Sequence, residues 1–248
     1  MGTDKYSDIA ETYDHMLFEN TEKENFFVKT FHRCNVKSIL DCACGTGKDL
    51  LFFKSLQYDV TGSDISDAML AMAQKRIDEN GLQIPLYKSD YQFLENTFNT
   101  KFDAIVCLSN AINDTEVDIV KALNSMKNVL NDRGIIVFDQ GQTDMLLQNP
   151  PSYSLEVNNR DFSRLFTMDY KKDDMTIKIF DLIHTDTQSD FKVNEFKFKI
   201  RLYNDWEKIL DAVNLDGEYY GNWDLSSYDK QTSKRLIVVA RRRNNAGS

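Results

Sequence analysis

An acid and two closely spaced glycines follow a short apolar run near residue 40. The run Val36 to Leu40 ends in Asp41, and Gly45 and Gly47 come just before the helix-like stretch Lys48 to Phe53. This order predicts a buried strand, a tight turn and a helix start, with glycines where the backbone must come close to a ligand. Open α/β sheets bind ligands at the carboxyl ends of their strands. We therefore expect a binding site at this turn.

The spacing of the glycines argues against phosphate as the ligand. A dinucleotide fingerprint needs Gly or Ala at position 50, where the chain has Leu50. A P-loop ending at Gly47-Lys48 needs Gly at position 42 and Ser or Thr at position 49, where Cys42 and Asp49 stand. Asp41 would also repel a phosphate. An acid beside close-approach glycines suits a cationic amine joined to a nucleoside, and S-adenosylmethionine (SAM) contains both.

A second acid, Asp64, is placed to hold the ribose of such a nucleoside. It ends the stretch that begins at Tyr58, and it follows Gly47 by 17 residues, close to the separation used by ribose-binding acids. A carboxylate there can accept hydrogen bonds from both ribose hydroxyls. The alternative role is a helix cap, because Asp64 and Ser66 directly precede the helix predicted at residues 67–79. The two roles are compatible.

Two segments together resemble the class I SAM-dependent methyltransferases. The stretch Leu40 to Gly47 (LDCACGTG) resembles motif I of that family. The stretch Val60 to Ala73 resembles the family's second strand, its ribose-binding acid and the helix that follows. Two motifs in the right order and at the right separation are far more specific than a lone glycine turn. The resemblance implies SAM as cofactor and S-adenosylhomocysteine (SAH) as product.

The resemblance also implies a set of cofactor-binding residues. In the family, an acid after the third strand accepts from the adenine amino group and the next residue lies against the ring; Asp90 and Tyr91 match these positions. The run Tyr6 to Asp14 resembles the N-terminal segment that closes over the cofactor in small-molecule methyltransferases. Alternatively, Tyr13 is a packing aromatic. The predicted cofactor-binding residues are Tyr13, Asp41, Ala43, Gly45, Gly47, Asp64, Ile65, Met69, Asp90, Tyr91 and Leu108.

The candidates for catalysis are Tyr13, Asn110 and Asp114. Residues 102–108 predict a buried fourth strand, and in the family the end of that strand passes beneath the transferred methyl group. Asn110 can donate and accept hydrogen bonds at a substrate amine, or it can form a turn before the next helix. An amine must be neutral to attack, so the site needs a proton acceptor or surroundings that lower the amine pKa. The sequence identifies no indispensable general base.

A third segment indicates the acceptor. Residues Asp139 to Asp144 stand where glycine and sarcosine N-methyltransferases carry Asp-His-Arg-Asn-Tyr-Asp, and the turn Cys107 to Asn110 also resembles theirs. The arginine that holds the amino-acid carboxylate in those enzymes is Gly141 here. A guanidinium fork is hard to replace in carboxylate binding. We therefore expect an amine acceptor other than glycine.

The elements that position these residues predict an α/β fold. We expect a Rossmann-like seven-stranded methyltransferase sheet, mostly parallel with an antiparallel last strand, and an inserted antiparallel β lid. Residues 1–36 would form an N-terminal helical cap, 37–148 and 204–243 the SAM-binding core, and 149–203 the insert, where the apolar period changes to two. The insert would roof the active site; the alternative is a solvent-facing or dimerising sheet.

Several details of these elements can be tested. In the insert we expect about three strands, turns at 172–174 and 188–190, and a β-bulge near Asn194-Glu195, where the alternation slips by one residue. Elsewhere the apolar spacing predicts helices at 4–15, 22–32, 115–130 and 204–213. A turn at 131–134 would precede the fifth strand at 135–139.

Charge and cysteine usage restrict the partners and the compartment. The net charge of −9 argues against nucleic acid or an anionic membrane as the main partner, because binding phosphate needs a basic face. The four cysteines and three histidines show no metal-ligand spacing, so no metal is expected. Free thiols, an N-terminus without a signal-peptide core and the lack of a long apolar run indicate a cytoplasmic protein. Both a monomer and a homodimer stay open.

The sequence therefore predicts a SAM-dependent methyltransferase that acts on a small molecule. An amine nitrogen is the favoured acceptor, reached by direct in-line displacement. The alternatives are O-methylation of a small metabolite and a non-catalytic protein that binds SAM or SAH.

Overall fold

The structure is a computed structural model that describes residues 4–16, 20–184 and 189–243. The predicted turn at 188–190 falls partly outside the described residues, and so does the predicted N-terminal cap, at residues 1–3 and 17–19.

Seven strands form one sheet in the order β10-β11-β5-β4-β1-β2-β3. Their bounds are β1 Ser38–Asp41, β2 Asp59–Asp64, β3 Leu86–Lys88, β4 Phe102–Cys107, β5 Leu130–Gln140, β10 Leu215–Tyr220 and β11 Leu236–Arg242. Neighbouring strands are parallel except at β11, which runs antiparallel to both β5 and β10. The predicted Rossmann-like sheet with an antiparallel last strand is confirmed.

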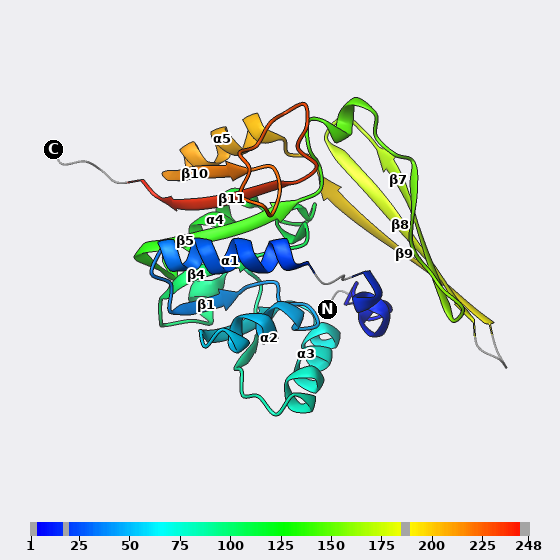
Figure 1. The fold of residues 1–248 in the computed structure, drawn as a ribbon, viewed down its shortest axis with the longest axis horizontal. Coiled ribbons are helices and arrows are strands. Elements are labelled where there is room, and N and C mark those ends of the chain that lie inside the picture. Colours follow the sequence, from blue (N-terminus) through cyan, green and yellow to red (C-terminus); the bar gives the residue numbers. More distant parts are fainter. Residues whose placement is uncertain (1–3, 17–19, 185–188, 244–248) are drawn as a thin grey trace.

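Helices cover both faces of this sheet (Figure 1). Their bounds are α1 Thr21–Arg33, α2 Lys48–Ser55, α3 Asp67–Glu79, α4 Ile119–Asn128 and α5 Tyr203–Ala212. Successive residues of β1 point to opposite faces, so Ile39 joins the buried cluster under α1 and α2, and Leu40 joins the one under α4 and α5. The layers hold the carboxyl ends of β1, β2 and β4 rigidly side by side.

Three predicted elements differ from the structure. Residues 4–15 do not form an α-helix: turns lead into the 3₁₀-helix η1, Ala10–Met16, where the carbonyl of Thr12 accepts from Arg164 Nη1 at 3.1 Å. α4 begins at Ile119 and not at residue 115, because Asp118 caps it by accepting from the Lys121 N–H at 3.1 Å. Residues 131–134 are no separate turn but an irregularity within β5.

A second, antiparallel sheet of four strands lies between β5 and α5 in the sequence and beside the core in space (Figure 1). We call it the inserted sheet; its strands are β6 Tyr153–Asn158, β7 Phe162–Tyr170, β8 Asp174–His184 and β9 Ser189–Lys199. The expectation of about three strands is wrong by one, because β6 lacks the strict alternation of the other strands. The remaining short helices are η2 Leu94–Asn96, η3 Ala111–Asn113 and η4 Leu146–Gln148.

The predicted bulge near Asn194 is also wrong. β8 and β9 pair without interruption from Asp174↔Lys199 to His184↔Ser189. Phe191 and Val193 lie on the outer face, 57% and 50% exposed, whereas Phe196 lies on the inner face and is 7% exposed. The apolar residues of β9 therefore move from one face of a regular strand to the other. In the sequence this change looks like a one-residue slip in the alternation. The irregularity in this sheet lies between β6 and β7.

Candidate active site

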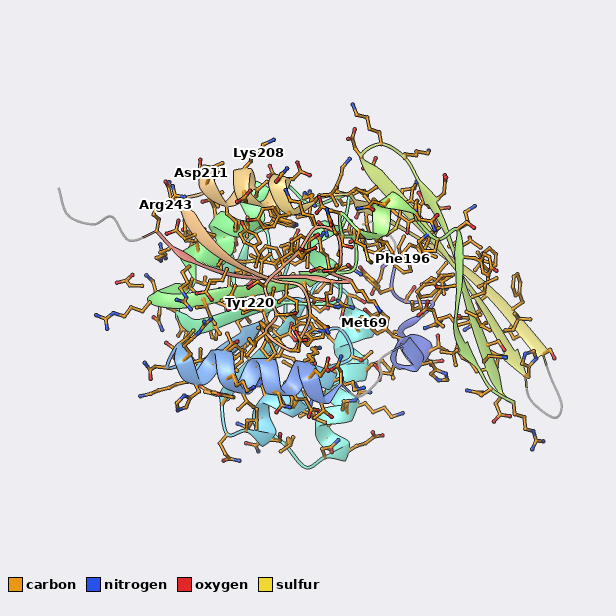
Figure 2. The ribbon with its side chains drawn as sticks, turned by 45° about the horizontal axis from the view of Figure 1, so that its top comes forward. Met69, Phe196, Lys208, Asp211, Tyr220 and Arg243 are labelled. Atoms are coloured by element: carbon orange, nitrogen blue, oxygen red, sulfur yellow. The ribbon has the colours of Figure 1, made fainter. Side chains whose placement is uncertain are left out.

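A cavity of about 490 Å³ lies among the carboxyl ends of the core strands, the N-terminal segment and the inserted sheet. Figure 2 labels one wall residue from each side, Met69 at the start of α3 and Phe196 on β9. Every predicted site residue except Gly47 lines this cavity. The lining residues among those predicted are Tyr13, Asp41, Ala43, Gly45, Asp64, Ile65, Met69, Asp90, Tyr91, Leu108, Asn110 and Asp114.

The two glycines of the β1–α2 turn have different roles. Gly45 has φ +50° and directs its N–H to Asp64 Oδ2 at 2.8 Å, on the wall of the cavity. Gly47 has φ +80° at the N-terminus of α2, and an added Cβ would lie 3.0 Å from the Cβ of Ala73. Gly47 therefore lets α2 pack against α3 and does not line the cavity.

Asp64 is held by the backbone around it. Its Oδ1 accepts from the Ser66 N–H at 2.9 Å and its Oδ2 from the Gly45 N–H. Ser66 caps α3, since its Oγ accepts from the Met69 N–H at 3.1 Å. Burial raises the pKa of Asp64, and the two N–H donors partly offset this. Each carboxylate oxygen keeps a second acceptor position, which suits a pair of hydroxyls.

We expect Asp64→Ala to weaken SAM binding by about tenfold or more, because hydrogen bonds to a charged group are worth about 1.5–3 kcal/mol each. Isothermal calorimetry on the folded variant measures this. Asp67→Ala is the matched control, because it removes the same charge from a side chain that is 72% exposed three residues away. Unchanged affinity in folded Asp64→Ala would overturn the ribose assignment.

Asp41 is a buried acid on the cavity wall. It is 2% exposed, and its Oδ1 accepts from the Ala43 N–H at 3.2 Å. Burial raises the pKa of Asp41 well above its usual range, and the charge of Asp49 raises it further. The ammonium of Lys23 lies 2.8 and 2.7 Å from the two oxygens of Asp49, so Asp49 holds that cation. A buried carboxylate of this kind fits a cationic ligand group such as the amine of SAM.

The N-terminal segment, residues 4–16, is fastened to the core. The Asp4 carboxylate accepts from Ser66 Oγ at 2.7 Å, and Asp14 accepts from Thr46 Oγ1 at 2.5 Å and pairs with Arg76. Tyr13 lies between these anchors. Burial, together with the charge of Asp64, raises its pKa to about 12, so Tyr13 is a neutral phenol at physiological pH. It can donate a hydrogen bond and is a poor general base.

Asn110 and Asp114 lie where the chain leaves β4. Asn110 has φ +66°, and its Oδ1 accepts from the Gly141 N–H at 2.7 Å, so its amide NH₂ is the part left to donate. Asp114 accepts from the Glu116 N–H at 3.0 Å and forms an ion pair with Lys5. A backbone bridge to Phe198 of β9 fixes Asp114 against the inserted sheet.

Sequence reasoning missed part of the cavity wall. Tyr6 lines it and stacks on Phe196, with ring centroids 5.2 Å apart. Tyr6 belongs to the run of residues 6–14 that resembles a cofactor-closing segment, and the period-two pattern predicted the inserted sheet. Neither signal shows which side chains face the cavity. No local signal could pair Lys5 with Asp114, which is 109 positions away. The inserted-sheet residues on the wall are Phe166, Ile177, Ile179, Phe196 and Phe198.

Comparison with known proteins points to one family. Residues 39–134 match the family described as "Methyltransferase domain". A glycine/sarcosine N-methyltransferase of Parasynechococcus marenigrum is 30% identical over 146 residues, which cover 57% of this chain and 52% of the relative. The chain spans about half the length of the curated relatives it matches.

Solved structures share the fold over nearly the whole chain. A SAM-dependent methyltransferase from Clostridium acetobutylicum has a TM-score of 0.83 at 19% identity, covering 96% of this chain and 99% of its own. A SAM-bound amino pentose methyltransferase from Micromonospora echinaspora has a TM-score of 0.71 at 18% identity, covering 93% and 95%. The predicted fold is thereby confirmed, and residues 39–134 match a methyltransferase domain, as the resemblance in the sequence predicts.

Proposed function

We propose that this protein transfers the methyl group of SAM to an amine nitrogen of a small molecule. One observation carries the proposal. A single cavity is lined on one side by the acids and glycine of the predicted SAM site and on the other by the inserted sheet. A cofactor and a small acceptor could therefore share one space. We also propose the division of the chain into the N-terminal cap, the SAM-binding core and the inserted lid that the sequence predicts.

The cavity would bind the cofactor at one end and the acceptor at the other. Asp64, Asp90 and Asp41 would hold the ribose, adenine and amine of SAM, with Ile65, Met69 and Tyr91 beside the nucleoside. When bound, SAM would supply an electrophilic methyl carbon: the lone pair of the neutral amine would form the N–C bond while the C–S electron pair goes to sulfur, and Asp114 would take up the proton that the amine gives up. Alignment of reactants in this way can lower a barrier by about 7–11 kcal/mol. Tyr13 and the apolar face of the inserted sheet would exclude water.

Nitrogen is favoured over oxygen by the groups at the acceptor end. Asp114 offers a carboxylate that can bind a substrate ammonium and accept its proton, which frees the nitrogen lone pair for attack, and Asn110 can orient the nitrogen. The relatives named as glycine/sarcosine N-methyltransferase and amino pentose methyltransferase act on amines by their names. O-methylation of a small metabolite is the second candidate, because the Tyr13 phenol and Asn110 amide could also orient a hydroxyl.

The substrate class and the cellular compartment are also part of the proposal. We infer a small-molecule substrate and a cytoplasmic location, supported by four free cysteines, since disulfide-free thiols are usual in reducing compartments. None of the helices in the described parts of the chain is long and apolar enough to cross a membrane.

The test is incubation of the purified protein with methyl-labelled SAM and a panel of amines, amino acids and hydroxy compounds. We expect labelled N-methyl product and stoichiometric SAH, detected by mass spectrometry, and none with Asp64→Ala at low SAM concentration. Transfer to hydroxyl compounds alone would favour the second candidate. Binding of SAM without transfer to any compound would instead support a non-catalytic binding protein.

A further inference from the structure

We propose that the acceptor is an amine on an uncharged, largely apolar body, that Asp114 receives its ammonium, and that Lys5 occupies the place of this ammonium until the substrate arrives. The inference deepens the proposed function and rests on it. Three features carry it: the Lys5–Asp114 ion pair in the cavity wall, a second partner for Lys5 nearer the solvent, and the charge of the remaining wall.

The first feature is an ion pair between a surface residue and an inner one. The side chain of Asp114 is 12% exposed and that of Lys5 is 35% exposed, and both line the cavity. A carboxylate so far removed from water needs a cation or hydrogen-bond donors. Lys5 supplies an alkylammonium, which is the same chemical group that a primary amine substrate carries. The Lys5 ammonium also lies 5.6 Å from the centre of the Tyr6 ring, on the same wall.

The second feature gives Lys5 another partner when it leaves Asp114. Lys5 Nζ already lies 3.3 Å from an oxygen of Glu116, whose side chain is 79% exposed. Asp114, in contrast, is fixed by the Glu116 N–H and by its backbone bridge to Phe198. A substrate ammonium can therefore take over the fixed acid while Lys5 keeps its solvent-exposed partner. The number of ion pairs is the same before and after this exchange.

The third feature excludes anionic groups on the substrate body. Beside Lys5, the described wall holds the cations Lys23 and Lys48; Lys23 is bound to Asp49, and Lys48 is also engaged. Gly141 supplies no guanidinium near Asn110. The side of the cavity formed by the inserted sheet and the residues packed on it is apolar. Its residues belong to a cluster of Ile9, Ile179 and Phe196 with partly buried Tyr6, Tyr13, Phe166, Ile177 and Phe198 packed on it. A carboxylate or phosphate placed there would lose its water without gaining a cation.

Calorimetry on the SAH-loaded protein tests the inference without relying on turnover. The probes are hexylamine, its alcohol 1-hexanol and its α-carboxylated counterpart 2-aminoheptanoate. We expect hexylamine to bind about tenfold or more tightly than either counterpart, because an unpaired or wrongly paired charge at such a site costs this much. Equal binding of the amino acid or the alcohol would overturn the inference.

Variants separate the two charged residues. In Lys5→Gln, hexylamine should bind about tenfold more tightly, because it no longer displaces a cation, while Lys5→Arg should behave like the wild type. Asp114→Asn should lose about tenfold in hexylamine affinity with SAH affinity unchanged. Lys29→Gln, an exposed lysine of α1, removes the same charge elsewhere and should change neither affinity.

Failure of this inference differs from failure of the proposed function. If Lys5→Gln leaves hexylamine affinity unchanged, or if SAH-loaded protein binds no amine of the series, Asp114 and Lys5 do not form the acceptor site. The methyltransferase proposal then still stands if labelled methyl groups reach another acceptor. Conversely, a protein that binds SAH and amines without any transfer keeps the Lys5–Asp114 site and loses the proposed activity.

Discussion

Asp41→Asn is expected to weaken SAM binding by about 100-fold and at the same time to stabilise the ligand-free protein. Loss of one partner from a buried charged pair costs about 2–5 kcal/mol in binding, and about 2.7 kcal/mol is 100-fold. Asparagine keeps an oxygen that can accept from the Ala43 N–H, so the local fold has no reason to change. The substitution removes the negative charge of Asp41, which we propose binds the amine of SAM.

The gain in stability follows from the direction of the pKa shift. Burial holds the folded-state pKa of Asp41 well above its usual range, so the folded protein binds a proton more tightly than the unfolded chain does. The stability that this contributes is present below the unfolded pKa of about 3.9 and is lost as pH rises through the folded pKa. Once Asp41 is ionised, the folded wild type therefore carries a disfavoured buried charge that Asp41→Asn lacks. About 1 kcal/mol of relief would raise Tm by roughly 2–4 °C.

Thermal unfolding and SAM calorimetry from pH 5 to pH 8 test both parts. The Tm advantage of the variant should grow as pH rises through the folded-state pKa of Asp41, and wild-type SAM affinity should rise with it, while the affinity of the variant stays flat. Asp59→Asn, an exposed acid at the start of β2, is the control for loss of charge alone. Wild-type SAM affinity in Asp41→Asn at pH 7 would contradict our assignment of Asp41.

The cofactor end of the site could be predicted because its residues are set by local rules. The β1–α2 turn and the β2–α3 turn lie side by side at the carboxyl ends of two neighbouring parallel strands. Two short motifs therefore determine the positions of Gly45 and Asp64. The spacing tests that argued against phosphate needed only the identities of three residues, Cys42, Asp49 and Leu50. For the same reason the Ser66 cap of α3 could be foreseen from its type and position.

The acceptor end could not be predicted to the same depth, because it is made by contacts between distant segments. Asp114 could be suspected from its place after β4, but its pairing with Lys5 depends on how the N-terminal segment crosses the cavity. In the inserted sheet, the residues that face the core are decided by register and not by composition. Phe191 and Phe196 look alike in the sequence, yet one is exposed and the other lines the cavity.

A buried ion pair shows how those distant segments are tied together. Arg164 on β7 lies directly opposite Asp181 on β8, and neither side chain is exposed. The guanidinium donates to both carboxylate oxygens, at 2.6 and 2.5 Å. It also donates to the carbonyl and the hydroxyl oxygen of Thr12, at 3.1 and 2.9 Å. The pair therefore joins the inserted sheet to the N-terminal segment, at the residue before Tyr13.

Arg164→Met is accordingly expected to reduce the free energy of unfolding by about 3–5 kcal/mol, because it leaves the buried Asp181 carboxylate without its cation. The double variant Arg164→Met/Asp181→Leu should recover most of this loss, since apolar residues of similar volume often replace a buried ion pair without destabilisation. Urea unfolding of the wild type, both single variants and the double variant gives the coupling energy. Lys178→Met is the control, because its pair with Glu195 is exposed and should contribute about 1 kcal/mol or less.

The double variant also separates the stability of the sheet from the position of Tyr13. Even with stability recovered, it lacks the donors to Thr12, so the N-terminal segment should leave the cavity more readily. We expect SAM affinity to fall by about threefold to tenfold, the value of one or two hydrogen bonds, and proteolytic cleavage within residues 4–16 to become faster. If SAM affinity and cleavage stay at wild-type values in the double variant, Arg164 only stabilises the inserted sheet. A selective loss of both would instead show that the pair holds Tyr13 over the cofactor end of the cavity.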